Sequence, residues 1–339
     1  MNRFFAWCAL RPPGKSANAA CSINQTASMS TMLVLMGGFL QLFLDLDDSW
    51  FRFLPLVFSV LLFGLPHGAI DHLILIGLSG RKLNAKTLGA VVCIYLSLSI
   101  LFAALWWLFP ILAAIAFLLM TIYHWGKSDT AFELLHDSES CLNNHPRYRW
   151  VHSLFRGLIP IGMPFLFFPG RTHTFLETCV RFFSAELPNM NAIRVMIGIV
   201  LFLFIVAEAY CLWHSRGNGQ IRLALEGLAL LIFFASVPPL IAIGWYFSFW
   251  HGLRHVYRLL RYRCDQERII PLFSQFIRFA VRSAPFTLVS VLLLLIMTGL
   301  VPIGNSPDEW VALYLVLISA LTFPHVLLVE WMDKRELSE

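Results

Sequence analysis

The sequence predicts an all-α, polytopic helical membrane protein with about eight transmembrane helices, and its composition and patterning support this fold class. Of the 339 residues, 58% are hydrophobic and only 13% are charged, and the mean hydropathy is +0.71. Soluble domains carry about 25% charged residues, so this chain has too little polar surface to cover a water-exposed globule. Apolar runs of about 20 residues, long enough to span a bilayer as a helix, recur along the chain.

The apolar runs divide the chain into a short polar tail and one membrane domain. Residues 1–30 are rich in Ser, Ala and Asn, and they predict a disordered tail rather than a secretory signal because their apolar stretch is short. Residues 31–335 predict a single helical membrane domain, since spanning segments must satisfy their own backbone hydrogen bonds. The apolar runs lie at roughly 32–46, 52–78, 88–108, 111–127, 152–169, 193–213, 223–250, 285–303 and 310–331.

Charges in the connecting loops predict the orientation of the chain in the membrane. Loops rich in Lys and Arg face the cytoplasm, and this rule gives a multi-pass protein of the cell (inner) membrane with both termini in the cytoplasm. Three apolar runs lie between two loops assigned to the cytoplasm, where an even number of crossings is required. We expect the run 152–169 not to span the membrane, because it contains three prolines and prolines interrupt helices.

Composition also excludes several classes of function. The net charge of +5 is modest, and the basic stretch Arg254–Arg268 predicts a loop at the membrane surface rather than the basic face of a nucleic-acid-binding domain. Seven cysteines without a CxxC pair argue against a disulfide framework or a zinc–thiolate site. A microbial rhodopsin needs a lysine inside the membrane for its Schiff base, whereas the five lysines here lie in tails or at helix ends.

Ionisable residues inside membrane segments are costly and usually functional, and in this chain histidines mark four such clusters. The clusters lie at residues 64–72, 124–129, 250–255 and 324–333. In the first cluster, Gly64, Pro66 and Gly68 predict a local helix break that opens the backbone around a site.

The spacing within two clusters is compatible with metal binding. His251 and His255 are four residues apart, which places both imidazoles on one helix face where they can bind one metal. His67 and Asp71 have the same spacing, so the carboxylate can accept one ring N–H of His67 and leave the other nitrogen for a metal. Both spacings also occur by chance or at helix ends without a metal.

The predicted topology places the histidines of the four clusters at one depth. The helices that carry His67, His124, His251 and His325 all run from outside to inside, and each histidine lies near the cytoplasmic end of its helix. We expect them to share a site in this layer, with Asp129 either orienting His124 or binding a neighbouring loop.

Neutral imidazoles alone leave the identity of the metal open. Such ligands suit iron, copper, zinc or nickel, and the absence of thiolates argues against Cu(I) or an iron–sulfur cluster. Iron with open positions permits O2 chemistry, whereas zinc favours hydrolysis by a metal-activated water.

Aromatic side chains near the clusters are of the kind that lines the pocket of a long polyene, although most aromatics in such a chain are packing residues. They include Trp125, Tyr246, Phe247 and Trp250.

Five sequence blocks resemble the Brp/Blh family of membrane-bound β-carotene 15,15′-dioxygenases of bacteria and archaea. The resemblance covers roughly residues 35–335, and each block combines a histidine or a proline-rich run with unusual neighbours. Two positions depart from the pattern: Gly252, where Ser is expected in many members, and Trp125, where Phe is expected. The blocks are LPHGAIDH at 65–72, HWGKSD at 124–129, GLIPIGMPFLFFP at 157–169, YFSFWHGLRHVYR at 246–258 and TFPHVLLVEWMD at 322–333.

The resemblance implies an iron-dependent enzyme that uses O2 to split the central double bond of β-carotene into two molecules of all-trans-retinal. It implies Fe(II) as the cofactor, a substrate that enters from the lipid bilayer, and a functional link to a microbial rhodopsin that uses the retinal. The implied iron ligands are His67, His124, His251 and His255, with supporting roles for Asp71, Asp129 and His325.

Two other functions remain compatible with the residues alone. A zinc membrane hydrolase would use the same ligand types, and metal analysis separates it from an iron enzyme. A carotenoid- or retinal-binding membrane protein would hold the pigment without consuming it, and loss of colour from β-carotene-accumulating cells separates it from a dioxygenase.

Overall fold

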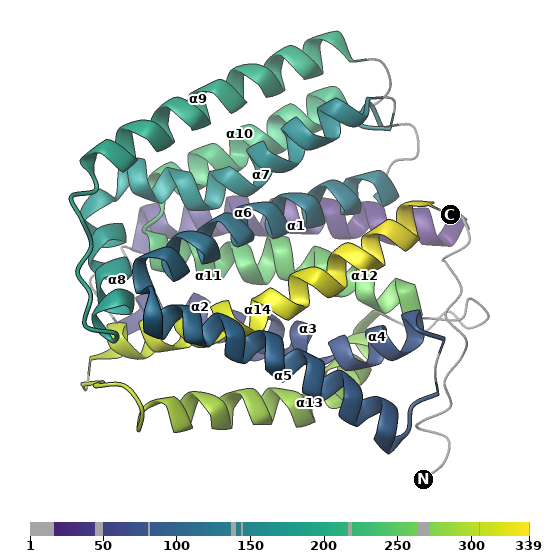
Figure 1. The fold of residues 1–339 in the computed structure, drawn as a ribbon. Helices are drawn as coiled ribbons and strands as arrows, with labels where there is room; N and C mark the ends of the chain where they lie inside the picture. The colour runs from purple at the N-terminus through teal and green to yellow at the C-terminus, as the bar shows by residue number, and fades with distance from the viewer. Residues whose placement is uncertain are drawn as a thin grey trace.

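The computed structural model describes residues 17–44, 50–80, 82–136, 140–143, 145–215, 219–263, 272–304 and 306–338; most of these residues are helical, and none forms a β-strand (Figure 1). The elements are α1 (Ala17–Leu44), the 3₁₀ turn η2 (Trp50–Phe53), α2 (Leu54–Ser59), the π-helical segment η3 (Val60–Gly64), α3 (Leu65–Ala69), α4 (Asp71–Leu78), α5 (Ala85–Leu108), α6 (Pro110–His136), α7 (Pro146–Phe167), α8 (Pro169–Arg181), α9 (Asn191–His214), α10 (Gln220–Ser236), α11 (Pro239–Tyr246), the π-helical segment η4 (Phe247–Gly252), α12 (Leu253–Arg263), α13 (Leu272–Met297) and α14 (Pro307–Ser338).

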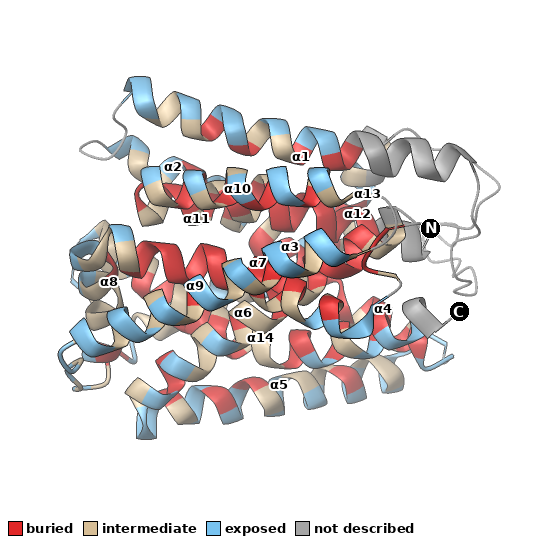
Figure 2. Cartoon of the chain, turned by 90° about the horizontal axis from the view of Figure 1, so that it is seen from above, coloured by how far each residue is buried: buried red, intermediate tan, exposed pale blue. Residues whose placement is uncertain are grey.

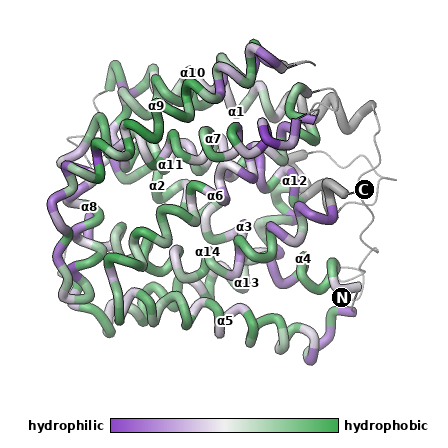
Figure 3. Tube along the Cα trace, turned by 45° about the horizontal axis from the view of Figure 1, so that its top comes forward, coloured by the Kyte–Doolittle hydropathy of each residue, from purple (hydrophilic) through white to green (hydrophobic). Residues whose placement is uncertain are grey.

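The long helices form a bundle whose outer face is apolar. Buried residues concentrate at the centre, and the outer helices expose much of their surface (Figure 2). Those exposed residues include large apolar side chains such as Ile100 on α5, Phe202 on α9 and Leu288 on α13, which are 65%, 63% and 68% exposed. Polar residues collect toward the two ends of the bundle (Figure 3). This arrangement suits a lipid environment, in which an apolar surface needs no burial.

Seven helical stretches of the described chain are long and apolar enough to cross a membrane, or eight if the bent pair α7 and α8 is one span. This number agrees with the predicted all-α, polytopic fold of about eight spanning helices. The seven stretches are Thr26–Leu44, Trp50–Leu78, Ala85–Leu108, Pro110–Leu135, Asn191–His214, Phe276–Met297 and Pro307–Arg335. The cytoplasmic location of the two termini stays a prediction.

The prolines of the run 152–169 interrupt the helix less than we expected. Helix α7 continues through Pro160 and Pro164 to Phe167, and only then does the chain bend by 108° into α8. The carbonyl oxygen of Pro164 still accepts bonds from the Phe168 amide and the Thr172 hydroxyl, each at 3.0 Å. Prolines are tolerated inside membrane helices, where neighbouring groups can satisfy the carbonyl groups that they free. The non-spanning character of this run stays a prediction.

Two segments that were predicted to be irregular are helical. Helix α1 begins at Ala17, so residues 17–30 of the expected tail continue the first membrane helix, while residues 1–16 lie outside the described residues. Ser30 is buried, and its hydroxyl accepts a bond from Arg254 at 2.9 Å, which gives the polar side of this helix an interior partner. The first part of the predicted basic surface loop is α12, whose Arg254 and Arg258 are buried rather than exposed at the membrane surface.

Two glycines bring α6 and α7 into close contact beside the candidate site. A Cβ atom on Gly126 would collide with the backbone carbonyl of Ser153, and one on Gly157 would collide with the carbonyl of Ile122. Small residues permit such close approach of membrane helices. This crossing fixes the stretch of α6 that carries His124.

Two π-helical segments interrupt the helical stretches that carry His67 and His251. The segment η3 precedes His67 and ends at Gly64, the first residue of the predicted break, whereas Pro66 and Gly68 lie in the helix α3; η4 contains His251. The two segments contact each other. A Cβ atom on Gly252 would lie 2.9 Å from Cβ of Phe63, so the serine expected at this position does not fit without a shift. Such π-segments are frequent at functional sites.

Candidate metal centre

Histidines from α3, α6, η4, α12 and α14 meet at the centre of the bundle. His67, His124 and His251 each offer a ring nitrogen within 4.8 Å of the other two. The ring centroid of His255 lies 5.5 Å from that of His67, and the ring centroid of His325 lies 4.8 Å from that of His67. All five side chains are buried.

The depth of these histidines differs from the prediction. His124 lies near the middle of α6, and His325 lies near the middle of α14, whereas both were expected close to the cytoplasmic ends of their helices. The reason is that both helices continue past the apolar run into more polar sequence. The histidine cluster therefore belongs to the centre of the bundle rather than to one end.

Unsatisfied ring nitrogens provide a test of whether this cluster fits a metal ion. The Nε2 atoms of His124, His251, His255 and His325 are buried and have no hydrogen-bond partner among the described residues. Leaving a buried polar atom without a partner costs about 1–3 kcal/mol. A cation at the centre of the rings would satisfy these atoms together, and an all-imidazole set suits iron, copper, zinc or nickel. The histidines of this cluster are therefore suited to bind a transition-metal ion.

Hydrogen bonds on the outer side of the cluster orient three of the rings. Nδ1 of His67 lies 2.7 Å from the carbonyl oxygen of Phe63, and Nδ1 of His325 lies 2.7 Å from Oδ2 of Asp71. Nδ1 of His255 lies 3.3 Å from the Ser128 hydroxyl. A carbonyl or carboxylate can only accept, so His67 and His325 carry their protons on Nδ1. Their Nε2 atoms then keep a free lone pair, as metal ligands require.

Asp71 has a different partner from the one that we expected. The helical spacing predicted that it accepts a proton from His67, but it accepts from His325 on α14 and from the Tyr95 hydroxyl on α5. His67 cannot use Asp71 because its Nδ1 atom bonds to its own helix at Phe63. Asp71 therefore links three helices.

Asp129 does not orient His124, contrary to one of the two expectations for it. Its Oδ1 atom accepts from Nη1 of Arg254 at 2.7 Å and from Nε1 of Trp250 at 3.0 Å, and its Oδ2 atom lies 3.6 Å from Nε of Arg156. All four residues are buried. Asp129 thus orients the residue before His251 rather than His124.

Arg254 and Arg156 also pair with a second buried carboxylate, that of Glu226 on α10. Oε1 of Glu226 lies 3.4 Å from Nη2 of Arg254, and its Oε2 atom lies 3.2 Å from Nη2 of Arg156. Two arginines thus meet two carboxylates, which offsets the cost of burying each charge alone. On the other face of α12, Arg258 pairs with Asp333 of α14 at 2.5 Å. Ion pairs therefore hold α12, which carries His255, from both sides.

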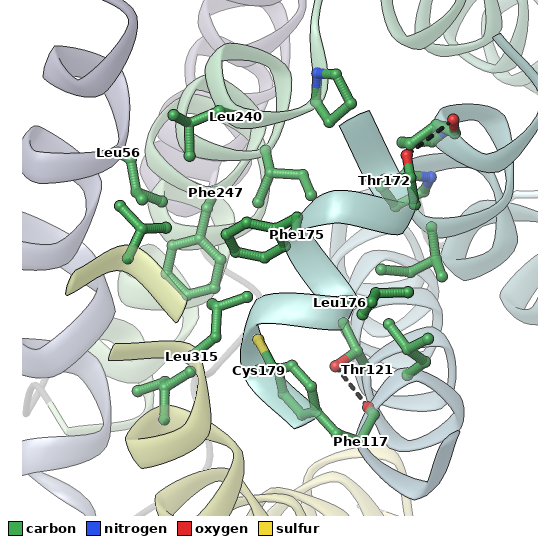
Figure 4. A pocket seen from close by; sticks show the side chains of 18 of the residues that line it. Leu56, Phe117, Thr121, Thr172, Phe175, Leu176, Cys179, Leu240, Phe247 and Leu315 are labelled. Atoms are coloured by element: carbon green, nitrogen blue, oxygen red, sulfur yellow. Dashed lines mark hydrogen bonds between the residues drawn. The ribbon is translucent and has the colours of Figure 1, made fainter. Parts of the chain in front are cut away.

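A cavity of about 580 Å³ opens onto the histidine cluster. His67, His124, His251 and His325 line it, and most of its wall is apolar. Side chains from α2, α6, α8, α11, η4 and α14 point into the cavity in Figure 4, and Phe175 and Leu176 show that α8 forms one wall. This shape suits an apolar ligand that reaches the histidines from one side.

Only two of the four aromatic residues predicted to contact substrate line this cavity. Trp125 and Phe247 do so, next to the histidines. Trp250 and Tyr246 are each 1% exposed and do not line the cavity. Trp250 bonds to Asp129, and Tyr246 packs against Trp125 with ring centroids 5.2 Å apart. Trp250 is thus directed toward the ion pairs around Asp129, and Tyr246 toward the core behind Trp125, rather than toward the cavity.

Several buried residues of the bundle were not identified from the sequence, some of them at the site and others away from it. Arg156 and Glu226 beside the site, and Glu208 away from it, are charged residues inside apolar runs, and the rule that identified the histidines also applies to them. Tyr95 gave no comparable signal, because a tyrosine in an apolar helix is ordinary. Its contact with Asp71 depends on how two helices pack.

Fold and site together define a class of protein: a multi-pass helical membrane protein with a histidine cluster at the inner end of an apolar cavity. A family model described as Beta-carotene 15,15′-dioxygenase matches residues 58–333. The chain belongs to this family and is an enzyme of the β-carotene 15,15′-dioxygenase class.

Curated relatives agree with this assignment. The chain is 34% identical to the probable β-carotene 15,15′-dioxygenase Blh of Halobacterium salinarum, over 84% of this chain and 85% of the relative. It is 24% identical to the β-carotene 15,15′-dioxygenase of the uncultured marine bacterium 66A03, over 62% of this chain and 72% of the relative. It is 25% identical to the probable β-carotene 15,15′-dioxygenase Brp of Halobacterium salinarum, over 80% of each chain. No solved structure matches the chain significantly.

Proposed function

We propose that this protein cleaves the central double bond of β-carotene with O2 to give two molecules of all-trans-retinal, and that Fe(II) is its cofactor. His67, His124, His251 and His255 would hold the iron. The observation that carries the proposal is the cluster of buried imidazoles at the inner end of an apolar cavity. Membership of the dioxygenase family supports the same reaction.

The reaction balances without a further reactant. The central C=C bond and the O–O bond break, two C=O bonds form, and each oxygen atom ends in one aldehyde. No proton, electron donor or second oxidant is consumed. Bound iron supplies the redox chemistry with O2, and the protein supplies position and a dry environment.

The residues of this chain have three tasks in the proposed reaction. The apolar wall of the cavity excludes water and binds the polyene, which enters from the lipid bilayer because it dissolves there. Trp125 and Phe247, which line the cavity beside the histidines, hold the central part of the polyene near the metal. The ion pairs behind Trp250 fix the segment that carries His251. Retinal released into the membrane would serve a retinal-binding protein such as a microbial rhodopsin.

Expression in β-carotene-accumulating cells tests the proposed reaction. The wild-type protein should bleach the cells and produce retinal, whereas His251→Ala should abolish retinal formation and remain in the membrane. His214→Ala is a matched control, because His214 is an exposed histidine on α9 whose ring bonds to the carbonyl of Tyr210. Unbleached cells that contain folded, iron-loaded wild-type protein would favour a carotenoid-binding protein without catalysis.

Metal analysis of purified protein tests the proposed cofactor. About one iron per chain, lost in His251→Ala and retained in His214→Ala, is the expected result. Activity should return when metal-free protein receives Fe(II) and should not return with Zn(II). One zinc per chain, with activity supported by Zn(II), would replace the iron proposal with a zinc enzyme.

A further inference from the structure

We infer that His325 is a fifth imidazole ligand of the metal, and that Asp71 and Tyr95 are the residues that position it. The inference rests on the metal centre of the proposed function. It adds to that centre a ligand from a helix that carries none of the four proposed ligands. Those four ligands come from α3, α6, η4 and α12, whereas His325 lies on α14.

The first observation is the place of the His325 ring within the cluster. Its centroid lies 4.8 Å from that of His67, 5.0 Å from that of His124 and 5.5 Å from that of His255. By comparison, the centroids of His67 and His251, two of the proposed ligands, are 6.2 Å apart. The ring of His325 therefore lies as close to His67, His124 and His255 as the rings of the proposed ligands lie to one another.

The second observation is the state of its two ring nitrogens. Nδ1 donates to Asp71, and Nε2 is buried without a hydrogen-bond partner among the described residues. The ring also lines the apolar cavity. A buried Nε2 lone pair beside three other imidazoles is available to bind a cation, since no described residue donates to it.

The third observation is the support behind Asp71. Its Oδ2 atom accepts both the His325 ring N–H at 2.7 Å and the Tyr95 hydroxyl at 3.0 Å. The same hydroxyl lies 3.0 Å from the carbonyl oxygen of Leu321, one turn before His325 on α14. Tyr95 thus holds the carboxylate and the helix of His325 together. A carboxylate on the outer nitrogen of a histidine fixes its tautomer and raises its basicity as a ligand.

The protein contains a matched arrangement away from the cluster. His152 donates to Oε1 of Glu208 at 2.7 Å, the Tyr148 hydroxyl lies 3.3 Å from the same oxygen, and all three residues are buried. The ring contact of His152 is with Tyr148 and not with another histidine. A buried His–carboxylate–Tyr group is therefore not by itself a metal ligand, and the second group serves as an internal control.

The test compares metal binding in the two groups. We expect His325→Ala to lower the affinity for Fe(II), measured by competition with a chelator, by at least about 10-fold. Asp71→Asn should lower it by about 10–100-fold, the usual effect of losing a partner behind a ligating histidine, and Tyr95→Phe should lower it less. His152→Ala, Glu208→Gln and Tyr148→Phe should leave the Fe(II) affinity unchanged.

A spectroscopic measurement separates a ligand from a residue that only supports the fold. The electron paramagnetic resonance spectrum of the Fe(II) protein exposed to nitric oxide reports the ligand field. It should change in His325→Ala and Asp71→Asn and stay the same in the His152 and Glu208 variants. If His325→Ala does not fold, the near-isosteric Asp71→Asn still decides the question, because it fills the same volume and leaves the His325 imidazole in the protein.

The outcomes distinguish this inference from the proposed function. Wild-type Fe(II) affinity and an unchanged spectrum in both His325→Ala and Asp71→Asn would overturn the inference while leaving the four-histidine site intact. An equal loss of Fe(II) affinity in the variants of His152, Glu208 and Tyr148 would show that both buried groups only support the fold. That result would also overturn the inference that His325 is a ligand. Wild-type protein that forms retinal yet binds no iron would refute the iron site itself.

Discussion

The guanidinium carbon of Arg254 lies 3.6 Å from the centroid of the Trp250 indole, and the same guanidinium donates to Asp129 at 2.7 Å. Trp250 donates to the same carboxylate, so the three residues form a closed set of contacts. Trp250 directly precedes His251 in the π-segment η4. The charges behind the cluster therefore fix the backbone that presents this histidine.

Removal of the Arg254 charge should destabilise the protein strongly. In Arg254→Gln the carboxylates of Asp129 and Glu226 lose a buried cationic partner, and an uncompensated buried charge costs about 3–5 kcal/mol. The free energy of unfolding in detergent measures this loss. Arg254→Lys should recover only part of it, because an ammonium cannot reproduce the planar contact of a guanidinium with both carboxylates and the indole.

Arg52 provides the control for this prediction. It pairs with Asp308 at 3.0 Å, but the two side chains are 36% and 49% exposed. An exposed ion pair contributes about 0–1 kcal/mol, so Arg52→Gln should have little effect on unfolding. Equal losses in Arg254→Gln and Arg52→Gln would contradict a stabilising role for the buried pairs.

Two tryptophans near the site should respond differently to replacement by phenylalanine. Trp250→Phe removes the indole N–H that bonds to buried Asp129, which should cost about 1–3 kcal/mol. Trp125 lines the cavity at a position where phenylalanine is the expected residue in related sequences. Trp125→Phe should therefore keep both retinal formation and most of the stability. Thermal unfolding and retinal yield measure the two effects. A larger loss of stability in Trp125→Phe than in Trp250→Phe would contradict the stabilising role of Trp250.

The close crossing of α6 and α7 predicts that added methyl groups are not tolerated there. Gly126→Ala or Gly157→Ala forces the two backbones apart, and overpacking of this kind costs up to about 3 kcal/mol. Because His124 lies two residues from Gly126, the Fe(II) content should fall as well. Gly89→Ala is the control, since a Cβ atom on Gly89 has open space around it on the exposed face of α5. Intact unfolding energy and iron content in Gly126→Ala would show that the crossing does not position the site.

Rare residue types made part of this site predictable from the sequence. Histidines inside apolar runs are unusual, and those at positions 67, 124, 251, 255 and 325 all join one cluster. Helical spacing was less informative for Asp71, because spacing reports neighbours on the same helix only. The partner of this carboxylate, His325, lies 254 positions away in the sequence.

The burial of charged side chains was the feature of this structure that was hardest to predict from the sequence. The rule for basic loops placed Arg254 and Arg258 at the membrane surface, since it counts charges and does not consider their partners. In the structure Asp129, Glu226 and Asp333, from three other helices, neutralise them in the interior. Only tertiary packing determines which carboxylate meets which arginine.

A bulky side chain in the cavity should block turnover without removing the metal. Leu315 on α14 points into the cavity in Figure 4, and it is not one of the proposed metal ligands. Leu315→Trp should fill part of the 580 Å³ cavity and lower retinal formation by at least about 10-fold, equivalent to about 1.4 kcal/mol in the activation free energy. The iron content should remain that of the wild type. Leu288→Trp on the exposed face of α13 should change neither quantity, because its side chain is 68% exposed on the outer surface of the bundle. Full activity in Leu315→Trp would mean that the polyene approaches the histidines by another route.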